Sequence, residues 1–123
     1  DLQCRQLNHK TGPGNILLAE VACRDITEVF STHGRISLRA ESVADQIVDQ
    51  VREWLDSGAA VAGHTADQLL LLLALAGSGS FTTPRITGHV HSHRQVIEHF
   101  LPVSIDFAAN RNGTVQHIRI TAA

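Results

Sequence analysis

The chain has 123 residues, 43% of them apolar, which is enough for the core of one ordinary domain. Its formal net charge of −2 excludes a broad basic surface, so any contact with nucleic acid has to be local. The two cysteines have neither the spacing of a metal site nor that of a disulfide framework. The sequence also shows no signal-peptide, lipid-attachment or membrane-spanning pattern. We therefore expect a reduced, cytoplasmic protein.

The first half of the chain is expected to form a turn, a β-hairpin and a helix. Gly12-Pro13-Gly14 is a strong turn signal, and two β-rich runs follow at residues 15–23 and 26–31. Between residues 39 and 55 apolar side chains recur every four positions, at Val43, Ile47, Val51 and Leu55. This spacing predicts an amphipathic helix, which Gly58 should end.

A cluster of polar side chains precedes a leucine-rich run in the second half. His64, Asp67 and Gln68 come directly before residues 69–76, a run far shorter than the roughly 20 residues that span a membrane. We therefore expect a core helix from 65 to 76 that is buried on all sides. The first turn of a helix carries unpaired N–H groups and the positive end of the dipole, so the cluster is a candidate phosphate site.

A purely structural interpretation of the same cluster is a capping box. In that motif the Thr65 hydroxyl would bond a backbone N–H of the first turn, and the Gln68 side chain would reach back to the cap. The capping box needs no ligand, but it leaves His64 and Asp67 unexplained. The residues alone leave both interpretations open.

The rest of the chain alternates between strand and helix patterns. We expect strands at 80–83 and 85–89, a helix at 92–100, and strands at 103–107 and 115–120. An Asn-Gly pair joins the last two strands as a hairpin. The expected order is therefore ββα followed by αββαββ, a mixed α/β (α+β) chain.

The Gly/Ala-rich stretch 58–63 divides the chain into two parts. A hairpin with a single helix is only part of a fold, because a two-stranded sheet is marginally stable and its helix needs a wider surface. We therefore assign residues 1–57 to one incomplete unit and residues 58–123 to another, and we expect that a longer protein supplies the neighbouring strands.

Three histidines, His89, His91 and His93, alternate at spacing two. On the expected strand they would share one face, and such a pair or triplet is a known metal-ligand arrangement. A metal-binding module or metal-dependent hydrolase is therefore an alternative function. This alternative is weakened because no Cys, Asp or Glu stands at metal-ligand spacing from the histidines. His89 by itself would also be compatible with a histidine that is hydrogen-bonded at the end of a strand.

Five features stand in an order that is specific as a set: GPGN at 12–15, ADQLLL at 66–71, ALAGSGSFT at 74–82, His89, and VIEHFLP at 96–102. With these features the chain resembles the C-terminal portion of RNA 3′-terminal phosphate cyclases over nearly its whole length. The resemblance implies that residues 1–57 are the second half of a thioredoxin-like insert domain, similar in topology only. Residues 58–123 would be the last βα repeat of the cyclase body.

The resemblance also implies an activity. Such enzymes convert an RNA 3′-phosphate end to a 2′,3′-cyclic phosphate with ATP and a divalent metal (Mg²⁺ or Mn²⁺), through a covalent histidine–AMP intermediate. His89 falls at the position of the nucleophile. Asp67 and Gln68 fall on an Asp-Gln pair of the nucleotide site, with Asp67 as the metal ligand, and His64 falls where a ring stacks on adenine.

The chain departs from the family in its length. The N-terminal portion of such enzymes supplies a metal-binding Glu, a Gly-rich segment and basic residues, and this chain contains none of them. We therefore expect RNA 3′-phosphate ends and the missing N-terminal portion as partners, no membrane partner, and an inactive isolated chain. Two alternatives are an inactive remnant and a non-catalytic, RNA-processing branch without the histidine. The presence of His89 favours the cyclase branch.

Overall fold

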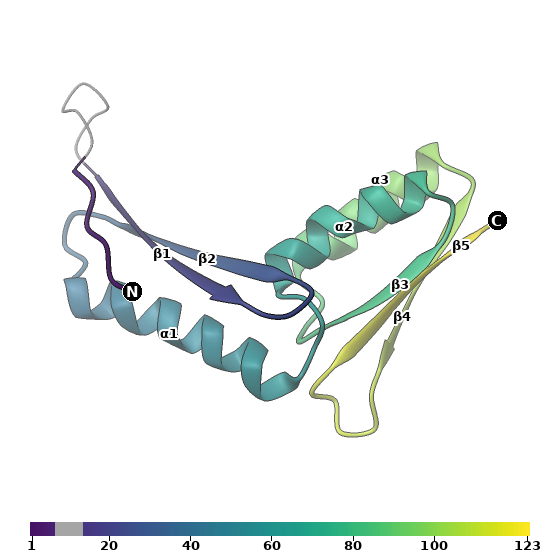
Figure 1. Cartoon of the computed structure of the whole chain (residues 1–123). Helices are drawn as coiled ribbons and strands as arrows, with labels where there is room; N and C mark the ends of the chain where they lie inside the picture. Colours follow the sequence, from purple (N-terminus) through teal and green to yellow (C-terminus); the bar gives the residue numbers. More distant parts are fainter. Residues whose placement is uncertain (7–13) are drawn as a thin grey trace.

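A computed structural model describes residues 1–6 and 14–123, so the turn expected around Gly12-Pro13 lies outside the described residues. The elements in chain order are β1 (Asn15–Ala22), β2 (Thr27–Gly34), α1 (Ala40–Ser57), α2 (Gly63–Leu75), β3 (Gly79–Thr83), α3 (Gly88–Phe100), β4 (Val103–Ala109) and β5 (Gln116–Ala122). Figure 1 shows β1, β2 and α1 in one half of the molecule and the remaining elements in the other. The described part is therefore a mixed α/β structure with three helices and two sheets.

The first sheet is an antiparallel hairpin that packs against α1. Strands β1 and β2 pair with Ala19 opposite Phe30, and α1 buries Val43, Ile47 and Trp54. The helix ends at Gly58, which adopts a left-handed φ of 66° and donates its N–H to the carbonyl of Leu55. The hairpin and the amphipathic helix expected from the sequence are confirmed.

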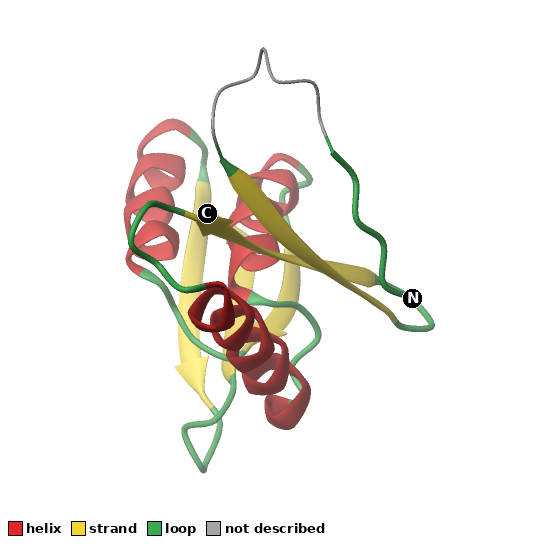
Figure 2. Ribbon diagram, turned by 90° about the vertical axis from the view of Figure 1, so that its left-hand side faces the viewer, coloured by secondary structure: helices red, strands yellow, loops and turns green. Residues whose placement is uncertain are grey.

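Only one face of this hairpin is covered. Ile16, Leu18 and Val29 point to the other face and are each half exposed, because no layer packs on them within the described residues. In Figure 2 the hairpin crosses in front of the second half, and Figure 1 shows it apart from the three-stranded sheet. The hairpin therefore presents an apolar face that no described element covers.

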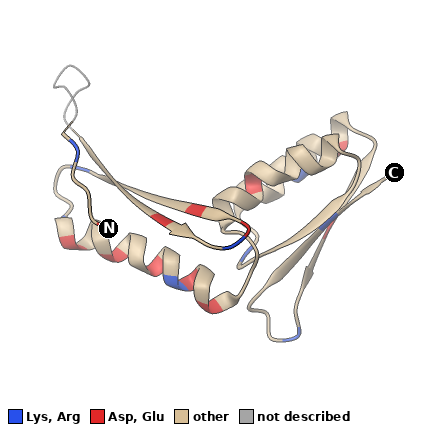
Figure 3. Ribbon diagram, in the orientation of Figure 1, with Lys and Arg blue, Asp and Glu red and all other residues tan. Residues whose placement is uncertain are grey.

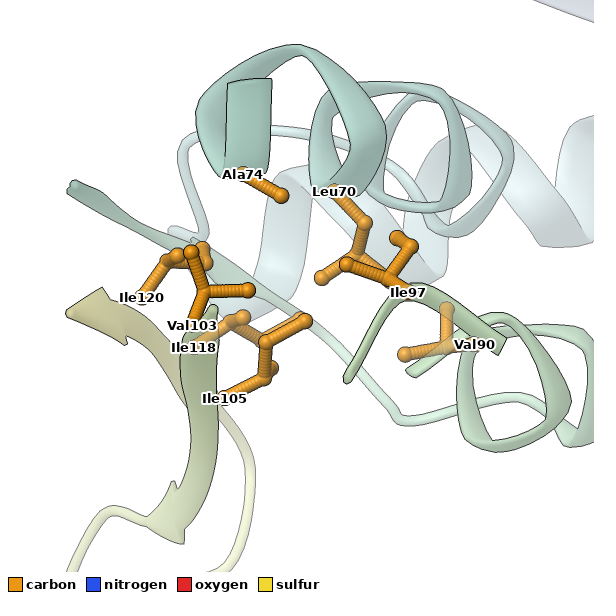
Figure 4. Close-up of a cluster of buried hydrophobic side chains, with 8 residues drawn as sticks. All are labelled: Leu70, Ala74, Val90, Ile97, Val103, Ile105, Ile118 and Ile120. Atoms are coloured by element: carbon orange, nitrogen blue, oxygen red, sulfur yellow. The ribbon is translucent and has the colours of Figure 1, made fainter. Parts of the chain in front are cut away.

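The second sheet has the antiparallel order β3-β5-β4, and α2 and α3 lie on one of its faces. Figure 4 shows the core between the helices and the sheet, which consists of Leu70, Ala74, Val90, Ile97, Val103, Ile105, Ile118 and Ile120. An Asn110 side chain closes the β4–β5 connection by accepting from the N–H of Val115. The expected hairpin between these strands is confirmed.

The strand expected at 85–89 is wrong. After β3 the chain forms a loop, and α3 begins at Gly88, earlier than the expected residue 92. The cause is local, since the Thr87 side chain accepts a hydrogen bond from the N–H of Val90 and caps the new helix. The order of the second half is therefore αβαββ.

The expectation that the leucine-rich helix is buried on all sides is also wrong for this chain. Helix α2 buries Ala66, Leu70 and Ala74, whereas Leu72 is 60% and Leu75 65% exposed. A helix on one face of a single sheet has a packing partner on only one side. None of the helices in the described part of the chain is both long enough and apolar enough to cross a membrane.

Candidate functional site

A cleft of about 150 Å³ lies between the two halves, at the start of α2 and α3. Three of the four predicted site residues, His64, Asp67 and His89, line it. Gln68 does not; its side chain is on the exposed part of α2. The other lining residues are Val29, Phe30, Gln50, Glu53, Trp54, Ala62, Gly63, Pro84, Arg85 and Thr87. The cleft therefore combines side chains from β2, α1, α2, α3 and the β3–α3 loop.

The first turns of α2 and α3 meet at this cleft. A Cβ atom added to Gly63 would lie 3.5 Å from Cγ2 of Thr87, so the two helix starts are in van der Waals range. The helices run side by side in the same direction (Figure 1), and both present their N-terminal ends to the cleft. The first-turn N–H groups that no side chain caps, together with the positive ends of the two helix dipoles, favour an anion here.

A hydrogen bond links the two helices beside the cleft. Oδ1 of Asp67 lies 2.9 Å from Nδ1 of His93, and each side chain is 34% exposed. A carboxylate only accepts hydrogen bonds, so the proton of this bond belongs to the imidazole Nδ1. His93 stands one helical turn after His89, on the flank of α3 that faces α2.

The histidine triplet does not form the expected ligand set. His89, His91 and His93 lie on a helix, so His91 is turned away from the other two. Its ring packs edge-on against Phe107, with the ring centroids 5.4 Å apart. Within residues 1–6 and 14–123 there is no group of three or more His, Cys, Asp or Glu side chains that could hold a metal ion. The strand geometry behind the metal-module alternative is therefore wrong.

The capping box is wrong as well, because another residue caps α2. The helix starts at Gly63 after Ala62, and no side chain of the same segment caps it. The cap comes from Glu28 on β2, whose Oε1 accepts from the N–H of Ala62 at 2.9 Å and whose Oε2 accepts from the Thr65 hydroxyl at 2.6 Å.

Glu28 is the residue that sequence reasoning missed. It is 1% exposed, and its two hydrogen bonds fix the start of α2, and hence His64 and Asp67, to the hairpin. One signal was available, since Glu28 shares the period-two pattern of Phe30 and Thr32, the buried face of β2. A glutamate on the buried face of a strand has to find hydrogen-bond donors.

One ion pair crosses the cleft. Nε of Arg85, on the β3–α3 loop, lies 3.5 Å from Oε1 of Glu53 on α1. Among the lining residues, Arg85 carries the guanidinium charge, whereas Glu53 and Asp67 carry two carboxylates. Figure 3 shows further acidic residues along α1. The side chains alone therefore do not make the cleft electropositive, so a polyphosphate there would need a cation.

The cleft contains one free carboxylate oxygen of the kind that binds a magnesium or manganese ion. Both ions prefer oxygen ligands, and Mg²⁺ is commonly held by one or two carboxylates together with phosphate oxygens and waters. Asp67 offers one carboxylate at the mouth of two helix N-termini, and only its Oδ1 is engaged by the described part of the protein. The cleft thus supplies one ligand of such a site.

Comparison with protein families matches residues 5–107 to RNA 3′-terminal phosphate cyclase. A Pseudomonas fluorescens protein named RNA 3′-terminal phosphate cyclase is 61% identical over 100 residues, 81% of this chain and 29% of that protein. A Pseudomonas aeruginosa protein of the same name is 47% identical over 121 residues, 98% of this chain and 35% of that protein.

A third relative with that name, from Salmonella enteritidis, is 44% identical over 102 residues, 83% of this chain and 30% of that protein. The chain therefore spans about a third of the length of the curated relatives it matches. The family match covers more than half of the chain and all of the residues that line the cleft. The chain belongs to the RNA 3′-terminal phosphate cyclase family.

Proposed function

We propose that the chain supplies the nucleophile side of an ATP-dependent RNA 3′-phosphate cyclase. The observation that carries this proposal is that His89, Asp67 and His64 line one cleft at two helix N-termini. Transfer of a nucleotide to a side chain needs a nucleophile and neutralisation of the phosphate charge, and a flat ring can in addition hold the base.

In the proposed reaction, an imidazole nitrogen of His89 attacks the α-phosphorus of ATP. A P–N bond forms, the bond from that phosphorus to the bridging oxygen breaks, and diphosphate leaves. An oxygen of the RNA 3′-phosphate then attacks the same phosphorus and frees the histidine. Finally the ribose 2′-hydroxyl attacks the RNA phosphorus, loses its proton and expels AMP. Neutral imidazole is a good nucleophile near neutral pH, and each displacement is easier than a direct one.

The remaining residues act on the nucleotide. Asp67 would hold a divalent cation, which would offset the charge of the phosphates beside the acidic side chains of the cleft. His64 is exposed at the start of α2, where its ring can stack on adenine. Gln68 is one turn further on and lies outside the cleft of this chain, so its proposed contact with the α-phosphate depends on the rest of the enzyme.

The size of the cleft supports a divided site. About 150 Å³ is below the roughly 300 Å³ at which ligand pockets begin, so the cleft holds part of a nucleotide. We assign residues 1–57 to the second half of the insert domain and 58–123 to the last repeat of the catalytic body. The N-terminal portion would close the site.

We also propose that the enzyme is cytoplasmic, because its two exposed, unpaired thiols suit a reducing compartment.

The experiment is a cyclisation assay with a hybrid enzyme. This chain replaces the matched 121 residues of the Pseudomonas aeruginosa relative, and the substrate is an oligoribonucleotide with a 3′-phosphate. The hybrid should form the 2′,3′-cyclic end with ATP and Mg²⁺, and the isolated chain should form none, because phosphoryl transfer needs positioning from several sides. No product from a folded hybrid, or product from the isolated chain at the hybrid's rate, would contradict the proposal.

A further inference from the structure

We infer that His93 is a positioning residue for the metal-binding carboxylate of Asp67. The inference rests on the proposed function of the cleft, and it starts from the one side-chain hydrogen bond that joins α2 to α3, the 2.9 Å contact between Nδ1 of His93 and Oδ1 of Asp67. Neither the predicted strand with its histidine triplet nor the predicted capping box anticipates this contact.

The contact divides the two oxygens of Asp67 between two tasks. Oδ1 accepts the Nδ1 proton of His93, so the carboxyl plane is fixed by an atom of the neighbouring helix. Oδ2 has no hydrogen bond from the described part of the protein and stays available to a cation. Groups that hold a metal-binding carboxylate by a hydrogen bond typically change metal affinity or activity by about 10–100-fold when they are lost.

The position of His93 ties this carboxylate to the nucleophile. His93 follows His89 by one turn on the same helix, and Thr87 caps that helix. A movement of α3 therefore carries His89 and the partner of Asp67 together. The hydrogen bond therefore sets the separation between the nucleophile and the cation-binding oxygen, and phosphoryl transfer depends on that separation.

The contact makes a specific demand on the side chain at position 93. The Nδ2 atom of asparagine is as many bonds from the backbone as Nδ1 of histidine, so His93→Asn keeps a donor near the same place. His93→Leu keeps comparable bulk and has no donor. His91 is the matched control, because it lies on the same helix and faces Phe107 instead of Asp67.

The first test measures adenylation of the hybrid enzyme as a function of Mg²⁺ concentration. His93→Leu should raise the concentration for half-maximal labelling about 10–100-fold, and His93→Asn should stay close to the unmodified hybrid. His91→Leu should label as the unmodified hybrid does. Equal impairment by leucine and asparagine at position 93, or no impairment by leucine, would overturn the inference.

The second test does not depend on activity. It uses NMR spectra of the hybrid labelled with ¹⁵N-histidine, recorded without metal and nucleotide at pH 8. The resonances that are absent from the spectrum of His93→Asn belong to His93, and they should show a proton on Nδ1. Asp67→Ala should remove that tautomer preference, because the acceptor is gone. A proton on Nε2, or a spectrum that Asp67→Ala does not change, would overturn the inference. Failure of the unmodified hybrid to label at His89 would instead reject the proposed function.

Discussion

Replacing the buried Glu28 should loosen the junction between the hairpin and the start of α2. In the native chain its carboxylate accepts two hydrogen bonds, from the N–H of Ala62 and from the hydroxyl of Thr65. Glu28→Ala removes both acceptors and leaves the N–H of Ala62, itself a buried residue, without its partner. Hydrogen bonds to a charged group contribute about 1.5–3 kcal/mol each.

Glu28→Ala should therefore lower the free energy of unfolding by about 3–4 kcal/mol. This value takes the lower part of the range for each hydrogen bond, because Thr65 is only half buried and its hydroxyl can bond to water instead. Glu28→Gln should cost about half of that. Its amide oxygen can accept from Ala62 and its NH₂ can donate to the Thr65 oxygen, but neutral hydrogen bonds are about half as strong as charge-assisted ones.

The assay is urea unfolding followed by tryptophan fluorescence. Trp54 is the one tryptophan of the chain, is 5% exposed and packs against Phe30, with ring centroids 5.8 Å apart. It therefore reports on the cluster beside Glu28. The matched control is Glu20→Ala on the exposed face of β1, which should stay within about 0.5 kcal/mol of the native chain. Equal stabilities for the Glu28 and Glu20 variants would refute the assignment of Glu28 as the cap of α2.

Three further changes separate stability from function. Leu70→Ala, at a fully buried site, should cost about 2–5 kcal/mol in the same unfolding assay, while Leu72→Ala, 60% exposed, should cost less than about 0.5 kcal/mol; similar costs would contradict the one-sided packing of α2. Gly58→Ala should cost about 1–2 kcal/mol because Gly58 has a φ of 66°, and an unchanged urea midpoint would contradict that backbone conformation. Asp67→Asn in the hybrid should keep its melting temperature and lose most adenylation with labelled ATP, whereas parallel losses of both would indicate a structural role.

Local signals in the sequence predict most of the elements. The four-residue spacing of apolar side chains predicts α1, and Gly58 ends it as expected. Turn residues separate β1 from β2 and β4 from β5. These features depend on residues within a few positions of one another, which is why pattern reasoning recovers them.

The errors arise where a local pattern competes with a cap or with a distant partner. The Arg85-Ile86-Thr87 run favours a strand by composition, but the Thr87 hydroxyl starts a helix instead. Thr65 fits a capping box, but its hydroxyl bonds Glu28, 37 positions away. The leucines of α2 indicate full burial, but the sheet of this chain covers only one side of the helix.

The candidate site was predictable in part. The resemblance groups His64, Asp67 and His89 in one proposed site, and these side chains line the same cleft. The bond from Asp67 to His93 joins residues 26 positions apart, and the cap from Glu28 to Ala62 joins residues 34 positions apart. No periodicity or short motif encodes such pairings, because they depend on how the helices and the hairpin pack.

Mapping the adenylated residue shows directly whether His89 is the nucleophile. The hybrid enzyme is incubated with ATP labelled at the α-phosphorus and with Mg²⁺, and the labelled peptide is sequenced. We expect an acid-labile, base-stable adduct on His89, normal labelling of His91→Ala, and no label in His89→Ala. A label that persists in His89→Ala, or that maps to His91, would contradict it.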